Sequence, residues 1–531
     1  MTLHGKHLIA GWTNGEATEG FRAWDPVQGA SLDPVFIEAS SADIDAAAEA
    51  AEAAFEAYAA TEPAHRADFL ERIASEIEGL GETLVERASR ETGLPEGRIR
   101  GERGRTVYQL RLFAAVVREG SWVDARIERA VPDRTPIPKP DLRRMSVPLG
   151  PVAVFGASNF PLAYSAPGGD TASALAAGCP VICKAHPAHP GTSELVAHAI
   201  LRAAEAEKMP AGVFSLVHGQ GYEVGLALVR HPLVQAVGFT GSLQGGRALF
   251  DAAAARPVPI PVYAEMGSVN PVFILPSALE NGAEALAEKL AGSILLGVGQ
   301  FCTNPGLVFG VGGEAMEAFL QALGEHIRRA EPASMLHRGI RDRFCAGTDR
   351  LAAAQGVERV AASEREADPA RTEGGGALFR TDVQTFLAND MLSEEVFGPS
   401  SLVVVARDTA ELESVAHSLK GQLTAAIHGD EEDIARYDRL VHVLRRKAGR
   451  FIFNGFPTGV EVCPAMHHGG PYPATTDVRT GAVGDTAIQR FVRPVAWQNF
   501  PSSALPPELR DRNERGIRRL VDGEYSTGDV E

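Results

Sequence analysis

The stretch GQFCTNPGLV, from Gly299 to Val308, places Cys302 directly after an apolar helical segment and directly before an apolar run. A cysteine thiolate can attack a carbonyl carbon and form a covalent intermediate with a substrate. A buried cysteine that only packs against apolar neighbours is the more common case. Whether Cys302 is a nucleophile therefore depends on the residues that the fold brings to it.

Further residues could assist such a nucleophile. Glu265, in VYAEMGSVNP, ends an apolar strand, where a carboxylate is either a buried hydrogen-bonded group or a general base. Asn159, in FGASNFP, lies at the tip of another strand and either caps the next helix or donates to a developing oxyanion. Glu395 and Phe397 lie in SEEVFGPS, which is also compatible with an ordinary loop. Taken singly, none of these residues identifies a function.

A nucleotide-binding sheet should also show how it holds phosphate. The G-x-G-x-x-G pattern is absent, and the nearest arrangement, Gly219–Gly225 with Gly221 inside it, is explained as well by a plain strand-to-helix turn. Gly241 and Ser242, in GFTGS, lie at another such turn, where backbone amides at a helix start could face an anion. Lys184 leaves the strand VICK at its carboxyl end, within reach of a ribose hydroxyl or a phosphate.

The composition limits the partners and the compartment. The 531-residue chain carries 51 basic and 68 acidic residues, a formal charge of −17, which argues against nucleic acid as a partner. Its five cysteines are sparse and odd in number, as is typical of a reducing compartment. The sequence has no signal-peptide pattern and no apolar run of about 18 residues, so we expect a cytoplasmic protein without a membrane partner.

No metal site is expected from the sequence. Cys179 and Cys183 are four residues apart, but no second pair completes a zinc site. Four loop histidines also lack convergent acidic or cysteine ligands in the sequence: His186, His189, His467 and His468. We interpret them as structural.

The order of elements predicts an α/β fold. A capping box formed by Ser40 and Asp43 begins a helix over residues 41–60, and a helical pattern continues over 65–118. From Pro151, apolar strands alternate with helices, which predicts a parallel sheet with helices on both faces. A second αβ series runs from Pro259 to about residue 455. The polar C-terminal stretch predicts one short helix.

The motifs together resemble those of the aldehyde dehydrogenase superfamily. The segments GPVAVFGASNFPLAY, VICKAHPAHPGTSELV, AVGFTGS, VYAEMGSVNPVF, GQFCTNPG and EEVFGP follow its order and approximate spacing over nearly all of residues 7–500. Within it, HPAHPGTSE, PIPVYAEM and MHHGGPYPATTD are similar to one branch. That branch holds the 2-oxoglutarate semialdehyde (2,5-dioxopentanoate) dehydrogenases and the NADP-dependent fatty aldehyde dehydrogenases.

This resemblance implies a Rossmann-type cofactor domain, an α/β catalytic domain and a small oligomerisation arm. The corresponding boundaries are 1–127 with 148–262, then 263–470, then 128–147 with 471–531. The family's assembly implies a homodimer or homotetramer, with the arm pairing against a strand near 485–500. The role of the tail after Phe500 is not defined by the resemblance.

The resemblance also implies roles at the reacting centre. Cys302 matches the nucleophile that forms a thiohemiacetal and then a thioester. Asn159 and the backbone N–H of Cys302 match the oxyanion hole, and Glu265 matches the base that activates water for thioester hydrolysis. The product is then a carboxylate.

Other matches imply an NAD or NADP cofactor. Lys184 matches a contact with the adenosine ribose, Gly241 and Ser242 the turn under the pyrophosphate, and Glu395 a contact with the nicotinamide ribose. Phe397 matches the ring packed beside that ribose, and Gly221 belongs to the cofactor-binding turn. Pro187 replaces the glutamate typical of NAD-preferring members, whereas Tyr222 stands where an arginine would hold a 2′-phosphate. Taken together, these two residues favour NADP slightly over NAD.

The branch implies 2,5-dioxopentanoate as the preferred substrate and a place at the end of sugar-acid catabolism, with a medium- or long-chain fatty aldehyde as the alternative. A distal carboxylate should meet an arginine or backbone amides, whereas a fatty chain should meet an apolar tunnel. A cysteine hydrolase or acyl transferase would need a histidine base, and no sequence motif indicates one. A CoA-acylating dehydrogenase would lack Glu265, and an inactive structural member would not need the reactive residues.

Overall fold

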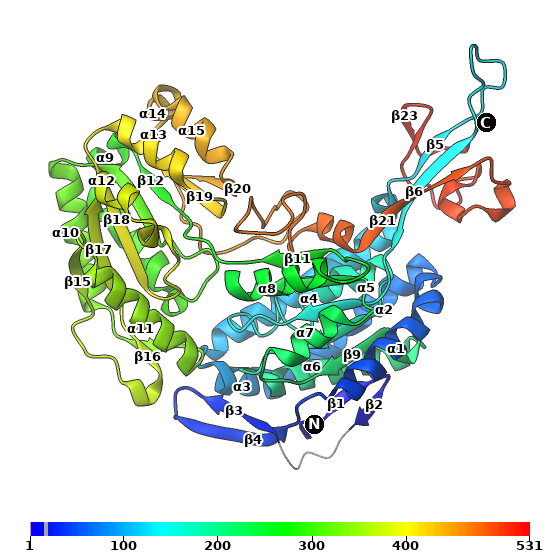
Figure 1. Cartoon of the computed structure of the whole chain (residues 1–531), viewed down its shortest axis with the longest axis horizontal. Helices are drawn as coiled ribbons and strands as arrows, with labels where there is room; N and C mark the ends of the chain where they lie inside the picture. Colours follow the sequence, from blue (N-terminus) through cyan, green and yellow to red (C-terminus); the bar gives the residue numbers. More distant parts are fainter. Residues whose placement is uncertain (1, 15–19, 531) are drawn as a thin grey trace.

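The computed structural model describes residues 2–14 and 20–530 and contains two α/β bodies side by side, with an arm that projects from the first (Figure 1). The first body is built on a seven-stranded sheet in the order β11-β10-β7-β8-β9-β1-β2. Its strands, in that order, are Val262–Glu265, Ala236–Thr240, Val152–Phe155, Val181–Lys184, Phe214–Val217, His7–Ile9 and Trp12–Asn14.

The five strands from β11 to β9 are parallel, as the alternating pattern predicts. Numbered by their order in the chain and read from β9 to β11, these strands run 3-2-1-4-5 across the sheet. Successive strands are therefore added on one side of β7 and then on the other, and the change of side lies between β7 and β10. In an open α/β sheet, ligands bind beyond the carboxyl ends of the strands at this reversal. The connecting helices are α5 (Gly169–Ala177), α6 (Pro190–Ala206), α7 (Glu223–Arg230) and α8 (Leu243–Ala254).

The N-terminal helices pack around this sheet. Helix α1 (Ser41–Ala59) begins at the capping box predicted from Ser40 and Asp43: each side chain bonds to the other's backbone N–H. The helical pattern that follows forms α2 (Pro63–Gly79), α3 (Gly81–Thr92) and α4 (Glu96–Glu119). A hairpin of β3 (Phe21–Asp25) and β4 (Ala30–Phe36) lies beside them.

The second body contains a seven-stranded sheet in the order β15-β17-β18-β13-β12-β19-β20. These strands are Glu358–Ala362, Ala377–Asp382, Ser400–Ala406, Leu307–Val311, Val272–Ile274, Gln422–His428 and Ala448–Phe453. Only β15 pairs antiparallel within it. Its helices are α9 (Pro276–Leu295), α10 (Glu314–Arg329), α11 (Arg338–Ala353), α12 (Val383–Ala388), α13 (Thr409–Ser418), α14 (Glu431–Arg436) and α15 (Asp438–Arg445); β14 (Ala333–Ser334) and β16 (Glu373–Gly374) form a small ribbon.

The arm is a separate five-stranded sheet in the order β21-β6-β5-β22-β23. Strand β21 (Val492–Gln498) pairs with β6 (Leu142–Pro148), which confirms the predicted pairing of the arm with a strand near residues 485–500. The other strands are β5 (Arg126–Glu128), β22 (Arg519–Val521) and β23 (Glu524–Ser526).

The tail after Phe500 differs from the single short helix predicted. It forms two short 3₁₀ turns and then the β22–β23 hairpin, which extends the arm sheet through parallel pairing with β5. The hairpin turns at Asp522-Gly523, both with positive φ, the dipeptide that favours a tight two-residue turn. Among the described residues, no helix has the length and apolar character needed to cross a bilayer.

Candidate active site

Helix α9 and an irregular turn present Cys302 between the two sheets. After α9 the chain enters a short turn in which Gly297, Val298 and Gly299 have φ between 57° and 63°. For valine this left-handed conformation is strained. At Gly299 a Cβ atom would lie 2.3 Å from the backbone of Gly398, so a side chain is excluded there. The turn thereby fixes the backbone three residues before the sulfur.

Cys302 and Glu265 meet at one imidazole, that of His468. The Sγ of Cys302 lies 3.5 Å from Nε2 of His468, and Oε1 of Glu265 lies 3.0 Å from the same nitrogen. His468 is fully buried and Glu265 is 5% exposed, whereas Cys302 keeps partial access to solvent. The nucleophile and base candidates named from the sequence are thus brought together, with a histidine between them.

His468 is a residue that the sequence pattern missed. It was interpreted as a structural loop histidine, and no local spacing connects it to Cys302, 166 positions earlier. The loop after β20 carries it back to the first sheet, where Thr475 forms an isolated bridge with Glu265. Its contact with Cys302 is therefore a tertiary feature without a local signal.

The surroundings of Cys302 favour the neutral thiol. Burial raises the pKa of this thiol well above its usual value, and the charges of Glu265 and Glu395 raise it further. A base must therefore accept the proton before the sulfur becomes a strong nucleophile. His468 and Glu265 are the groups in position to do so.

Asn159 lies beside the turn that presents the nucleophile. It follows β7, and its Nδ2 donates to the carbonyl of Gln300 at 3.1 Å. On the far side, Nδ2 of Asn270 donates to the carbonyls of Cys302 and Asn304, each at 2.9 Å. These amides fix the backbone on both sides of the sulfur.

Glu395 and Phe397 line a pocket that continues from the nucleophile loop to Ser268 and Asn304. Glu395 is an exposed residue as a whole, but desolvation of its carboxyl group by the surrounding protein raises the pKa of that group to about 7. A Cβ atom at Gly267 would lie 2.3 Å from Oε2 of Glu395, so a side chain at this position would displace the carboxylate. The pocket therefore presents a polar group near the sulfur.

The carboxyl ends of the first sheet hold the remaining candidates. Lys184, at the end of β8, is 9% exposed, and burial lowers its pKa to about 8 despite the opposing charge of Glu38. Among the described residues no carboxylate lies within 4.0 Å of its ammonium, so it has capacity for an added oxygen ligand. Ser242 caps α8 by accepting from the N–H of Gly245 at 3.1 Å.

The other cofactor candidates are open to solvent. Gly241, before that cap, and Gly221, in the loop from β9 to α7, are both exposed. Tyr222 is 82% exposed at the start of α7. Its ring offers no positive charge to a phosphate. The residues present thus fit the ribose and pyrophosphate of a dinucleotide beyond the carboxyl ends of β8 and β10.

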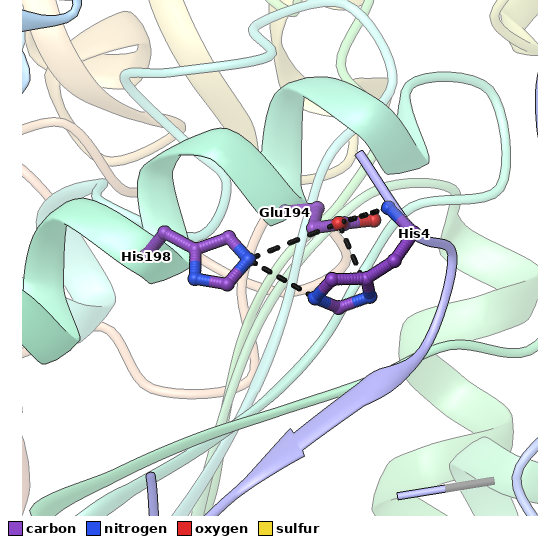
Figure 2. Close-up of side chains that lie close together, drawn as sticks. All are labelled: His4, Glu194 and His198. Carbon is purple, nitrogen blue, oxygen red and sulfur yellow. Dashed lines mark hydrogen bonds and ion pairs between the residues drawn. The ribbon is translucent and has the colours of Figure 1, made fainter. Parts of the chain in front are cut away.

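Within residues 2–14 and 20–530, two groups of side chains lie close enough to share a metal ion. One is the Cys302, Glu265 and His468 group itself. The other is formed by His4, Glu194 and His198, whose side chains converge in Figure 2. The sequence predicted neither grouping.

The His4 group is arranged as a hydrogen-bonded anchor. The two Nε2 atoms of His4 and His198 are 3.2 Å apart, and Glu194 accepts the N–H groups of His4 and Gly5 at 2.7 and 3.0 Å. The Lys6 N–H donates to Nδ1 of His4 at 3.0 Å, and the same nitrogen lies 3.3 Å from Oε1 of Glu194.

Comparisons with known proteins agree with this architecture. The aldehyde dehydrogenase family model matches residues 12–482, so the chain belongs to that family. It is 53% identical over 524 residues to alpha-ketoglutaric semialdehyde dehydrogenase 2 of Azospirillum brasilense, covering 98% of this chain and 99% of the relative. It is 49% identical over 490 residues to alpha-ketoglutaric semialdehyde dehydrogenase of Acinetobacter baylyi, covering 92% of each.

Solved structures share the fold. Betaine aldehyde dehydrogenase of Staphylococcus aureus, solved in complex with NAD⁺, superposes with a TM-score of 0.79 at 21% identity over 93% of this chain and 94% of that one. PnpE from Pseudomonas sp. WBC-3 gives a TM-score of 0.78 at 23% identity, covering 93% and 97%. The predicted α/β architecture of the aldehyde dehydrogenase type is thereby confirmed.

Proposed function

We propose that this protein oxidises 2-oxoglutarate semialdehyde (2,5-dioxopentanoate) to 2-oxoglutarate with NAD(P)⁺. The observation that carries the chemistry is the meeting of Cys302 and Glu265 at His468, with Asn159 beside the same turn. The names of the two relatives, matched over nearly their whole lengths, support the substrate.

Catalysis begins with transfer of the Cys302 proton to His468 or Glu265, followed by attack of the sulfur on the aldehyde carbon. The oxyanion of the thiohemiacetal is stabilised by Nδ2 of Asn159 and the backbone N–H of Cys302. A nicotinamide cofactor, when bound at the carboxyl ends of the first sheet, would supply the hydride acceptor that oxidation of the thiohemiacetal on Cys302 to a thioester requires. Glu265, once it has released any proton taken from Cys302, takes a proton from water, whose oxygen attacks the thioester. The carbon–sulfur bond breaks, and the sulfur leaves with that proton, which gives the carboxylate and the thiol.

Lys184, Gly221, Gly241 and Ser242 hold the adenosine and pyrophosphate end of the cofactor, and Glu395 and Phe397 its nicotinamide ribose. The absence of a carboxylate at Pro187 permits the 2′-phosphate of NADP. The exposed Tyr222 gives that phosphate no charged partner. We therefore expect the protein to use both NAD and NADP, with a slight preference for NADP.

The contacts of His468 argue against a cysteine hydrolase. In a nucleophile–histidine–carboxylate triad the carboxylate binds Nδ1 while Nε2 faces the nucleophile. Here both Glu265 and Cys302 contact Nε2, and Nδ1 is buried without a hydrogen-bond partner among the described residues. His468 therefore does not pass a proton from Cys302 at one ring nitrogen to a carboxylate at the other, as a triad histidine is arranged to do. Its Nε2 instead lies beside both Cys302 and Glu265.

We further propose a cytoplasmic homodimer or homotetramer assembled through the arm, with the domain boundaries predicted from the sequence. The exposed edge of β21 and the folded tail support this role for the arm. Light scattering of the purified protein tests the assembly.

Absorbance of reduced nicotinamide tests the activity. Purified protein is mixed with 2,5-dioxopentanoate or with a medium-chain aldehyde, each with NAD⁺ and with NADP⁺. We expect the dioxo acid to give the higher kcat/KM. Turnover of the apolar aldehyde alone would retain the chemistry and overturn the substrate, and no turnover with any pair would overturn the proposed function.

A further inference from the structure

Three arginines lie near Cys302. Arg98 and Arg105 are seven residues apart on α4, two helical turns, and therefore share one face of the helix. Arg450 lies on β20 of the other body. Each of the three guanidinium groups is near enough to Cys302 to interact with its charge. Cations from two bodies therefore converge on the nucleophile.

Arg98 is tied to the nucleophile turn itself. Its guanidinium lies between two aromatic rings, 4.8 Å from the centroid of Phe160 and 4.5 Å from that of Phe301. One terminal nitrogen donates to the carbonyl of Asn159 at 2.9 Å. The other, Nη1, is buried and has no hydrogen-bond partner among the described residues. A Cβ atom at Gly297 would lie 2.8 Å from that nitrogen, which places it against the same turn.

Arg105 repeats this pattern. One terminal nitrogen donates to Oη of Tyr164 at 3.2 Å, and the guanidinium lies 5.2 Å from the centroid of that ring. Its Nη1 is again buried without a partner. Tyr164 in turn packs 6.2 Å from His468. Both α4 arginines thus keep one donor unused while their other end is fixed.

The three guanidinium groups form no direct ion pair with the described residues. Within the described part of the chain, no carboxylate lies within 4.0 Å of Arg98, Arg105 or Arg450. The nearest acidic residue on the same helix face, Glu102, uses Oε1 to accept the N–H groups of Leu162 and Ala163 at 2.8 and 2.9 Å. Burying a guanidinium without a direct anionic partner is costly, so each of these groups can gain from an added anion.

We propose that Arg98 and Arg105 bind the carboxylate of the substrate at the end remote from the aldehyde, while Arg450, whose two terminal nitrogens donate to the carbonyls of Gly459 and Pro457, adds only its charge. This inference rests on the proposed function, and it names the residues that make the protein specific for an aldehyde acid. A carboxylate can satisfy the unused donors of two guanidinium groups at once, with charge-assisted hydrogen bonds. A long hydrocarbon chain would leave these donors unsatisfied. The site therefore selects a short aldehyde acid over a fatty aldehyde.

Substrate pairs test this assignment. We would measure kcat/KM of Arg98→Gln and Arg105→Gln with 2,5-dioxopentanoate and with pentanal, an uncharged aldehyde of the same chain length. Loss of one charged hydrogen bond lowers the ratio of the two kcat/KM values about 10- to 100-fold, mainly through a higher KM for the acid. Glutarate, which carries carboxylates and no aldehyde, should inhibit the wild type competitively and each variant less.

Arg111→Gln is the matched control. It lies on the same helix, but its guanidinium is exposed and paired with Glu78, so both substrates should be oxidised as by the wild type. Equal loss of both substrates in Arg98→Gln and Arg105→Gln, or no change in their ratio, would overturn the inference while the proposed function stands. A wild-type protein that prefers pentanal would overturn both.

Discussion

The Nε2 atom of His468 lies 3.0 Å from Oε1 of Glu265 and 3.5 Å from Sγ of Cys302. One nitrogen thus contacts both the proposed base and the proposed nucleophile. Because the imidazole is fully buried, it can hold these two groups in a fixed relationship while the substrate changes from aldehyde to thioester.

Replacing His468 by phenylalanine should slow steady turnover. The ring size is kept, but the contacts of Nε2 with Sγ of Cys302 and Oε1 of Glu265 are lost, so we expect kcat to fall about tenfold. His467→Phe, one residue earlier and partly exposed, is the control. A kcat for His468→Phe within twofold of the wild type would contradict this role.

Glu265→Gln should separate the two halves of the reaction. Thioester hydrolysis loses its base, a change worth about 10²- to 10⁴-fold in rate. The first turnover should still reduce the cofactor, so stopped-flow absorbance should record a burst followed by a slow steady rate. If the burst also disappears, Glu265 is needed to remove the proton of Cys302.

The cofactor preference should respond to two positions. Pro187→Glu introduces a carboxylate that repels the 2′-phosphate, so kcat/KM with NADP⁺ should fall relative to that with NAD⁺. Tyr222→Arg supplies a cation and should shift the ratio towards NADP⁺ by about tenfold or more. The ratio of kcat/KM values measures both changes. An unaltered ratio in both variants would remove these residues from the ribose site.

Acid should destabilise the first body through His218. This fully buried ring stacks on His7 at 5.9 Å, and burial lowers its pKa to about 3, with His7 and Lys184 lowering it further and Glu194 opposing them. Because the unfolded state binds the proton near the ordinary pKa of 6.5, stability is full above that pH and falls as pH drops from 6.5 towards 3.

The thermal midpoint at pH 7.5 and at pH 5.5 measures this dependence. Both ring nitrogens of His218 lack a partner within the described residues, so His218→Phe should reduce the difference between the two midpoints. His442→Phe, on an exposed helix position, should leave that difference as in the wild type. An equal pH dependence in His218→Phe and the wild type would contradict the assignment.

The sequence was informative where chemistry or a cap depends on neighbouring residues. The capping box of Ser40 with Asp43, the strands that end at Lys184 and Glu265, and the turn before Cys302 each have a local pattern. The contacts of His468 and Arg98 with the turn before Cys302 have no local sequence pattern. They depend on how α4 and the loop after β20 pack against that turn. The β22–β23 hairpin had a signal, the Asp522-Gly523 turn, within a polar stretch that otherwise predicted a helix.

The most direct test of the account is to trap the acyl group on Cys302. Glu265→Gln protein would be mixed with NADP⁺ and 2,5-dioxopentanoate, quenched in acid and measured by mass spectrometry of the intact chain and of its peptides. We predict one added 2-oxoglutaryl group on the peptide that contains Cys302, and none in the Glu265→Gln protein that also carries Cys302→Ala. Reduced cofactor without an adduct on that peptide, or an adduct on another residue, would contradict the proposed mechanism.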